Sequence, residues 1–215
     1  MWMGEYTGIQ LLGLFFQALC VENFLLSNFL GMCTYLACST SLKTANGLGV
    51  AVVFVMTISG VLNYFVHHYF TAEHGLDWLQ SFGIDTSHIN LNFLEFLLFI
   101  SVIAAFTQIA EIIIEKVSLP LYRSLGIYLP LIAVNCAVLG VCLFSVIRNL
   151  PFLPHVVYVF GSACGWWLAI ALMAAIREKI AISSIFPSFK GMGITFIITG
   201  FIAMVFMGFS GIRLF

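Results

Sequence analysis

The sequence predicts an all-α integral membrane protein with six transmembrane helices. Of its 215 residues, 62% are hydrophobic and only 8% are charged, whereas a soluble domain carries about a quarter charged residues. Six apolar segments are long enough to cross a bilayer as helices. The alternating runs of about ten residues that mark membrane strands are absent. We therefore expect one membrane domain covering residues 1–215.

The six apolar segments differ in length. They are Ile9–Leu36, Gly47–Val66, Phe93–Ile114, Leu125–Ile147, Val156–Ile176 and Gly191–Ile212. The first exceeds the roughly 20 residues that a straight spanning helix needs. We expect it to tilt, to extend into the interface or to break.

The chain divides near Pro120 into two halves of three spans each, at about residues 8–118 and 121–215. Because three is an odd number, the halves must have opposite orientations, which is the arrangement of an inverted repeat. The first span of each half holds small or helix-breaking residues around one cysteine. These strings are Asn28–Cys33 and Leu129–Cys136. We therefore expect an interrupted first helix in each repeat.

Basic residues predict the orientation, because they favour the inner side of a membrane. With the amino terminus outside, the inner side holds Lys43, Lys116, Arg123, Arg177, Lys179 and Lys190, and the outer side holds only Arg148 and Arg213. The connection from His67 to Asn92 has no Lys or Arg, as expected outside. Within it, Leu76, Trp78, Leu79 and Phe82 are expected to form a short amphipathic turn at the interface. Both termini are predicted on the outer side.

Several function classes are excluded by composition and motifs. With 8 Lys plus Arg against 9 Asp plus Glu, the chain has no basic surface for nucleic acid. It contains no dinucleotide loop, phosphate loop or Ser/His/Asp grouping. Its 6 cysteines include no Cys-x-x-Cys, so a disulfide framework has no support. No complete active site is expected on this chain.

Cys33 and Cys136 are the candidate metal ligands. Thiolates are soft ligands suited to iron–sulfur clusters, zinc or copper(I), and nearby Gly31 and Asn135 permit close approach of the backbone. Iron–sulfur centres generally take four cysteines, so a cluster would need two from another chain. The alternative is that each is an ordinary small buried residue. That interpretation is kept for Cys20, Cys38, Cys142 and Cys164.

A site shared by the two cysteines requires the first span to bring Cys33 to the depth of Cys136. Cys136 lies at the centre of its segment, whereas Cys33 lies close to the end of its own. On straight helices their depths would differ by roughly 15 Å. The first span must therefore unwind, with Asn28 and Gly31 the expected place.

Glu22 is the candidate ion or proton site. It lies near the middle of the long first segment, beside Asn23, where burying an unpaired carboxylate costs several kcal/mol. The alternative is a hydrogen bond that stabilises the broken helix. For Trp166 and Trp167, stacking on a cofactor competes with plain packing, and Arg177–Lys179 is expected to be a solvated helix end.

Five strings are more specific than composition. They are Phe29–Thr34, Leu125–Ala137, Ile176–Lys179, Gly191–Ile197 and Phe209–Gly211. They resemble the E subunit of the sodium-translocating NADH:quinone oxidoreductase, Na+-NQR, over nearly the whole chain. Related membrane subunits of the Rnf ferredoxin:NAD+ oxidoreductase share the cysteine strings. The pair Glu22-Asn23 and the string Gly193–Phe196 favour the Na+-NQR branch.

The resemblance implies a subunit of a bacterial inner membrane that pairs with the homologous D subunit, of opposite orientation. It implies that Cys33 and Cys136 are ligands to an iron centre or [2Fe–2S] cluster shared with that partner. Flavins, NADH and quinone would then be handled by other subunits.

The function expected is an electron-transfer subunit of a Na+-translocating NADH:ubiquinone reductase that contributes to Na+ export. Three alternatives remain open. They are a subunit of the related Rnf complex, an inverted-repeat ion transporter in which Glu22 binds the ion, and a scaffold of helices without a cofactor. Iron that co-purifies separates the redox subunits from the other two.

Overall fold

The regular structure is helical in every part of the chain that can be described. The computed structural model describes residues 7–71, 92–117, 132, 134–182 and 191–209. Its elements are α1 (Gly8–Phe16), the π-helix η1 (Gln17–Val21), α2 (Phe24–Asn28), α3 (Met32–Cys38), α4 (Leu42–Val66), the π-helix η2 (His67–Thr71), α6 (Asn92–Val117), α9 (Cys136–Ile147), α10 (Phe152–Ile182) and α11 (Met192–Phe209). The all-α class predicted from composition is confirmed for these residues.

Each of the six apolar segments overlaps at least one of these helices. Three helical stretches are long and apolar enough to cross a membrane, namely Leu42–Tyr69, Glu95–Ile113 and Phe152–Ile182. Shorter apolar helices are Gly8–Val21, Cys136–Ile147 and Met192–Gly208. The chain is thus a multi-pass membrane protein, whereas the six crossings and the inverted symmetry stay predictions. The expected boundary at Pro120 and the turn around Trp78 lie outside the described residues.

The first span is broken, as its length predicts. One break lies at Phe29–Gly31, where Phe29 and Gly31 take positive φ angles of 55° and 85°. This is the place expected from Asn28 and Gly31. An additional break, which the sequence did not predict, follows η1. There the Asn23 side chain accepts hydrogen bonds from the backbone of Leu25 at 3.1 Å and Leu26 at 3.4 Å, and so begins α2.

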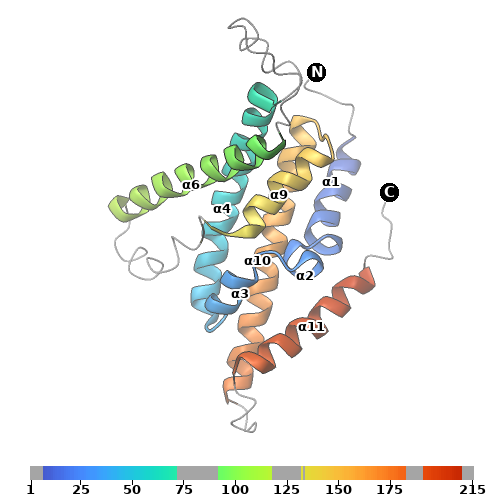
Figure 1. Ribbon diagram of the computed structural model, residues 1–215. Coiled ribbons are helices and arrows are strands. Elements are labelled where there is room, and N and C mark those ends of the chain that lie inside the picture. The colour runs from blue at the N-terminus through green and yellow to red at the C-terminus, as the bar shows by residue number, and fades with distance from the viewer. Residues whose placement is uncertain (1–6, 72–91, 118–131, 133, 183–190, 210–215) are drawn as a thin grey trace, which may run out of the picture.

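Helix α10 lies through the centre of the bundle (Figure 1). Its 31 residues extend about 46 Å at 1.5 Å per residue. It is antiparallel to α4, since Gly49 faces Trp167 and Gly60 faces Val159. On another side, Gly161 and Gly165 let the backbone of α1 and η1 approach closely. In lipid such packing replaces the hydrophobic effect as the main attraction between helices.

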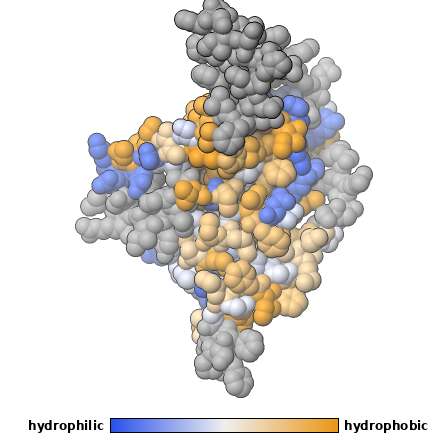
Figure 2. All heavy atoms as spheres, viewed as in Figure 1, coloured by the Kyte–Doolittle hydropathy of each residue, from blue (hydrophilic) through white to orange (hydrophobic). Residues whose placement is uncertain are grey.

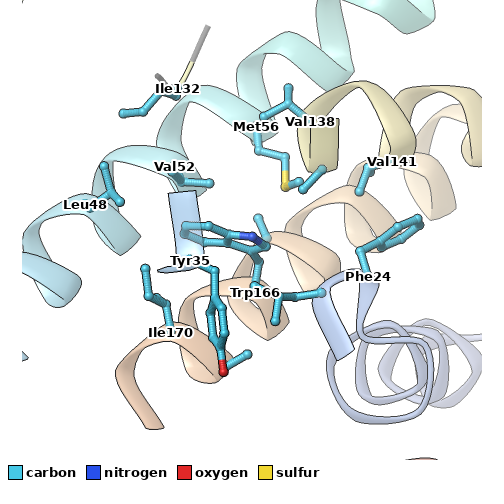
Figure 3. Close-up of a cluster of buried hydrophobic side chains, with 14 of the residues drawn as sticks. Phe24, Tyr35, Leu48, Val52, Met56, Ile132, Val138, Val141, Trp166 and Ile170 are labelled. Carbon is cyan, nitrogen blue, oxygen red and sulfur yellow. The ribbon is translucent and has the colours of Figure 1, made fainter. Parts of the chain in front are cut away.

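The core is formed where the broken first span, α4, α9 and α10 meet. Trp166 lies at its centre beside Tyr35, Val52 and Met56 (Figure 3), and all four are fully buried. The Tyr35 hydroxyl lies 3.2 Å from Thr199 Oγ1, which joins α3 to α11. The core therefore holds the segment with both breaks against three other helices.

The end of α10 is tied to the start of α4. Arg177 donates hydrogen bonds to the Leu36 carbonyl at 3.1 Å and to Ser39 Oγ at 2.7 Å. Glu178 accepts one from the backbone of Leu42 at 2.7 Å. The expectation of a solvated helix end agrees with the exposure of Glu178 and Lys179, whereas Arg177 is half-buried, and Arg177 and Glu178 also connect three segments. Arg148, in the turn between α9 and α10, lies at the opposite end of α10.

Helices α6 and α11 lie at the periphery, and both expose apolar side chains (Figure 1). On α6 these include Leu97, Ile109 and Ile113, and on α11 they include Phe201 and Met204. Figure 2 shows hydrophobic residues over much of the described surface on this side, with hydrophilic residues gathered at the far end of α6. Such a surface requires lipid or other apolar chains around it.

Gly165→Ala is expected to destabilise the folded subunit by about 1–3 kcal/mol. A Cβ atom at Gly165 would lie 2.7 Å from the Leu19 carbonyl oxygen, and a backbone atom cannot rotate away. The matched control is Gly200→Ala on α11, where a Cβ would meet nothing within 4 Å. The thermal unfolding midpoint of the purified complex should fall for the first variant and stay constant for the second. Equal midpoints would contradict the close packing of α10 on η1.

Candidate functional site

Cys33 and Cys136 each lie in the first turn of a helix. Cys33 is the second residue of α3, which begins after the break at Gly31. Cys136 is the first residue of α9, whose preceding residue Asn135 caps the helix by accepting from the backbone of Ala137 at 3.0 Å. Both side chains are exposed, whereas the other four cysteines are buried or half-buried.

One hydrogen bond joins the two loops that carry the cysteines. The Gly31 backbone N–H donates to Cys136 Sγ at 3.0 Å. Two residues span at most about 7 Å, so the Cys33 backbone nitrogen lies within about 10 Å of that sulfur. The depth difference expected for straight helices is removed by the break before α3. The structure therefore brings the two predicted site residues to one region.

Gly31 fits this place because it has no side chain. Its φ of 85° is one that residues with a Cβ rarely adopt. A Cβ there would lie 2.6 Å from Trp166 Nε1, 3.0 Å from Asn135 Oδ1 and 3.1 Å from Ala137 Cβ. The Gly31 carbonyl in turn accepts from Thr34 Oγ1 at 3.0 Å. The loop before α3 is thus seated on the start of α9 and on the Trp166 indole.

Two buried N–H donors at this place have no partner within the described part of the chain. They are Trp166 Nε1 and Asn135 Nδ2. The oxygen of the Asn135 amide caps α9, so only its nitrogen is left over. The packing role expected for Trp166 is confirmed by its full burial, but packing does not explain the unused donor.

The cysteine pair does not complete a metal site from this chain. Within the described residues no group of three or more His, Cys, Asp or Glu side chains is placed to hold a metal ion. Any further ligands to a metal bound by Cys33 and Cys136 would come from outside the described residues. Because both thiols are exposed, another chain can reach them.

Glu22 forms an ion pair with Arg148. Its Oε2 accepts from Arg148 Nη2 at 2.6 Å, and its Oε1 accepts from Gln17 Nε2 at 3.0 Å. The Arg148 guanidinium also lies 5.0 Å from the centre of the Tyr158 ring. The hydrogen bond from Gln17 agrees with the alternative that Glu22 stabilises the broken helix, and the ion pair also ties Glu22 to the turn between α9 and α10. Sequence could not reveal this partner, because the pair joins residues from opposite halves of the chain.

Comparisons with known proteins agree with the resemblance indicated by the sequence motifs around the cysteines. A family model described as "Rnf-Nqr subunit, membrane protein" matches residues 11–213. A Chlamydia muridarum protein, named as the E subunit of the Na(+)-translocating NADH-quinone reductase, is 58% identical over 99% of this chain and 86% of its own length. Proteins of the same name from Chlamydia pneumoniae and Rhodopirellula baltica are 53% and 45% identical, over 99% and 95% of this chain and 82% and 99% of their own lengths.

These relatives confirm the resemblance to the E subunit of Na+-NQR, and their shared name denotes one subunit of an oxidoreductase. The match extends through both cysteine strings and both halves of the chain. The chain belongs to the Rnf-Nqr family of membrane subunits.

Proposed function

We propose that this chain is an electron-transfer subunit of a Na+-translocating NADH-quinone reductase. In this proposal Cys33 and Cys136 supply two of the four thiolates of an iron–sulfur centre, and the homologous D subunit supplies the other two. The observation that carries it is the hydrogen bond from the Gly31 amide to Cys136 Sγ at 3.0 Å. It joins the loops that carry two exposed thiols from opposite halves of the chain.

The residues present fit a [2Fe–2S] cluster. Such a cluster takes cysteine thiolates as ligands and N–H groups as hydrogen-bond donors to its sulfurs. Both are at hand here, since the two cysteines lie beside the Gly31 amide and the unused donors of Trp166 and Asn135. The missing Cβ of Gly31 leaves the space in which these groups meet.

The chain's own residues would hold and orient the ligands. The start of α9 and the Gly31 N–H stabilise negative charge on Cys136 Sγ. The break at Phe29–Gly31 would let Cys33, at the start of α3, reach the same centre. The buried ring of Trp166 keeps water from the inner side of the site. When bound, the cluster would accept one electron and pass it on.

A homologous partner suits the surface that the cysteines occupy. A second subunit with the same pair of cysteine loops can present its own two thiols when it docks face to face. The exposure of Cys33 and Cys136 in this chain and the need for four thiolates support such a partner.

An iron and acid-labile sulfide assay on the purified complex tests the proposal. If the chain is an electron-transfer subunit, the complex should contain iron and sulfide in equal amounts, in addition to the iron and sulfide of its other centres. An ion transporter or scaffold without redox chemistry predicts none at this subunit. Absence of iron from a complex that keeps this chain would overturn the proposal.

Na+ export is the second part of the proposed function, and Glu22 is its candidate residue. Glu22→Gln is expected to leave assembly and the first NADH-to-flavin step intact but to weaken the dependence of quinone reduction on Na+. A Gln oxygen can still accept from Gln17, while the charge facing Arg148 is lost. The pair is partly exposed, so its loss costs the fold no more than about 1 kcal/mol.

Arg148→Gln is the matched control, because it breaks the same ion pair and leaves the carboxylate in place. Turnover measured against Na+ concentration separates the two roles. A defect confined to Glu22→Gln supports an ion role, whereas equal defects in both variants return Glu22 to a structural role.

The proposed location is a bacterial inner membrane with both termini outside. The end of the bundle where α10 ends and α4 begins carries three basic residues, Lys43, Arg177 and Lys179. Arg148 lies at the opposite end of the bundle. This grouping supports the predicted orientation. A membrane-impermeant maleimide should label Ser81→Cys in intact cells and Thr40→Cys, which is exposed between α3 and α4, only after permeabilisation. The reverse pattern would invert the topology.

A further inference from the structure

We infer that Trp166 and Asn135 donate hydrogen bonds to the iron–sulfur centre between Cys33 and Cys136 and raise its reduction potential. This inference rests on the proposed function. It starts from two buried nitrogen atoms, Trp166 Nε1 and Asn135 Nδ2, that have no hydrogen-bond partner among the described residues.

These two nitrogens differ from the other buried polar atoms without a partner. Five buried side-chain polar atoms of the described residues lack a partner, and three of them are oxygens: Ser59 Oγ, Asn63 Oδ1 and Tyr158 OH. The Trp166 indole nitrogen and the Asn135 side chain both lie next to Gly31. The point where a Gly31 Cβ would lie is 2.6 Å from Trp166 Nε1 and 3.0 Å from the Asn135 amide oxygen. Among the described residues, the two buried side-chain N–H donors without a partner thus belong to Asn135, which precedes Cys136, and to Trp166, which packs on Gly31.

The two N–H donors each require a hydrogen-bond acceptor. An indole N–H can only donate, and leaving it buried without an acceptor costs about 1–3 kcal/mol. The nearby Gly31 N–H already donates to a sulfur, Cys136 Sγ. The Trp166 indole N–H and the Asn135 side chain thus lie next to a residue whose own N–H has a sulfur as its acceptor. Cluster sulfides and thiolates are acceptors of this kind.

Hydrogen bonds to sulfur have a defined redox effect. The reduced cluster carries one more negative charge than the oxidised cluster, so its sulfurs accept hydrogen bonds more strongly. N–H donors then stabilise the reduced form and raise the potential. Trp166 and Asn135 are positioning residues here, since they would touch the cluster's sulfurs without ligating iron.

The test is a redox titration of the purified complex followed by the cluster's EPR signal. Trp166→Phe removes the indole N–H and keeps a large ring, and Asn135→Ser keeps an oxygen to cap α9 while removing the amide donor. Each should lower the potential by an amount that shifts the ratio of reduced to oxidised centre about tenfold, or about 59 mV for one electron. Iron content should stay constant. Trp167→Phe is the control, because the Trp167 indole donates to Asn46 Oδ1 at 3.2 Å, away from the site.

A second measurement does not depend on a folded variant. Wild-type complex labelled with 15N in the tryptophan indole should show coupling between that nitrogen and the reduced cluster in pulsed EPR. Absence of the coupling, or unchanged potentials in both variants, would overturn the inference. The two N–H groups would then donate to water or to a partner chain. Absence of any EPR signal from the site would instead overturn the proposed function.

Discussion

Replacing Cys33 or Cys136 with Ala is expected to remove iron from the purified complex and to abolish quinone reduction. Each change deletes one thiolate, and a four-cysteine centre cannot be completed with three. The NADH-to-flavin step should continue, because NADH and the first flavin would sit on other subunits. Iron analysis and the two partial reactions, measured on the same preparation, check this result.

The remaining cysteines serve as controls. Cys142 is fully buried and its sulfur accepts from Asn63 Nδ2 at 3.2 Å, so Cys142→Ala removes a hydrogen bond within the core. The half-buried Cys20 and Cys164 provide two further Ala variants. None of the three changes should lower iron content per assembled complex. If iron survives the loss of Cys33 or of Cys136, the assignment of ligands is wrong.

Gly31→Ala is expected to have the largest effect on stability, about 2–6 kcal/mol. A residue with a Cβ at the observed φ of 85° costs on the order of 1–3 kcal/mol, and overpacking against Trp166 and Asn135 adds a similar amount. Because the Gly31 N–H also contacts Cys136 Sγ, iron should be lost together with stability.

Gly193→Ala is the matched control for this change, since a Cβ there would meet nothing within 4 Å. The thermal midpoint of the complex and its iron content should both fall for Gly31→Ala and stay unchanged for Gly193→Ala. A Gly31→Ala complex with normal stability and iron would contradict the described contact between the two cysteine loops.

Much of the site could be predicted from residue types close together in sequence. Asn28 and Gly31 predicted the break at Phe29–Gly31, because neither residue favours a helix interior. The length of the first segment allowed a break as one of three outcomes, beside a tilt or an extension into the interface. The candidate cysteines were chosen by the strings around them, and they are the two that the structure exposes.

Contacts between distant parts of the chain could not be predicted in this way. Glu22 finds its partner in Arg148 and Asn23 donates to the Gly165 carbonyl at 2.7 Å, both across the two halves of the chain. The additional break at Glu22–Asn23 depends on these tertiary contacts. The unpaired donor of Trp166 also required the structure, since a buried tryptophan has no sequence signature that separates packing from hydrogen bonding.

The most direct test of the central claim is an experimental structure of the whole complex that resolves the sulfurs of Cys33 and Cys136. The account predicts both sulfurs, with two from the homologous partner, around one iron–sulfur centre, each about 2.3 Å from iron as in other metal–thiolate bonds. A distance of more than about 15 Å between the two sulfurs is far beyond the reach of such bonds and would contradict a shared cluster.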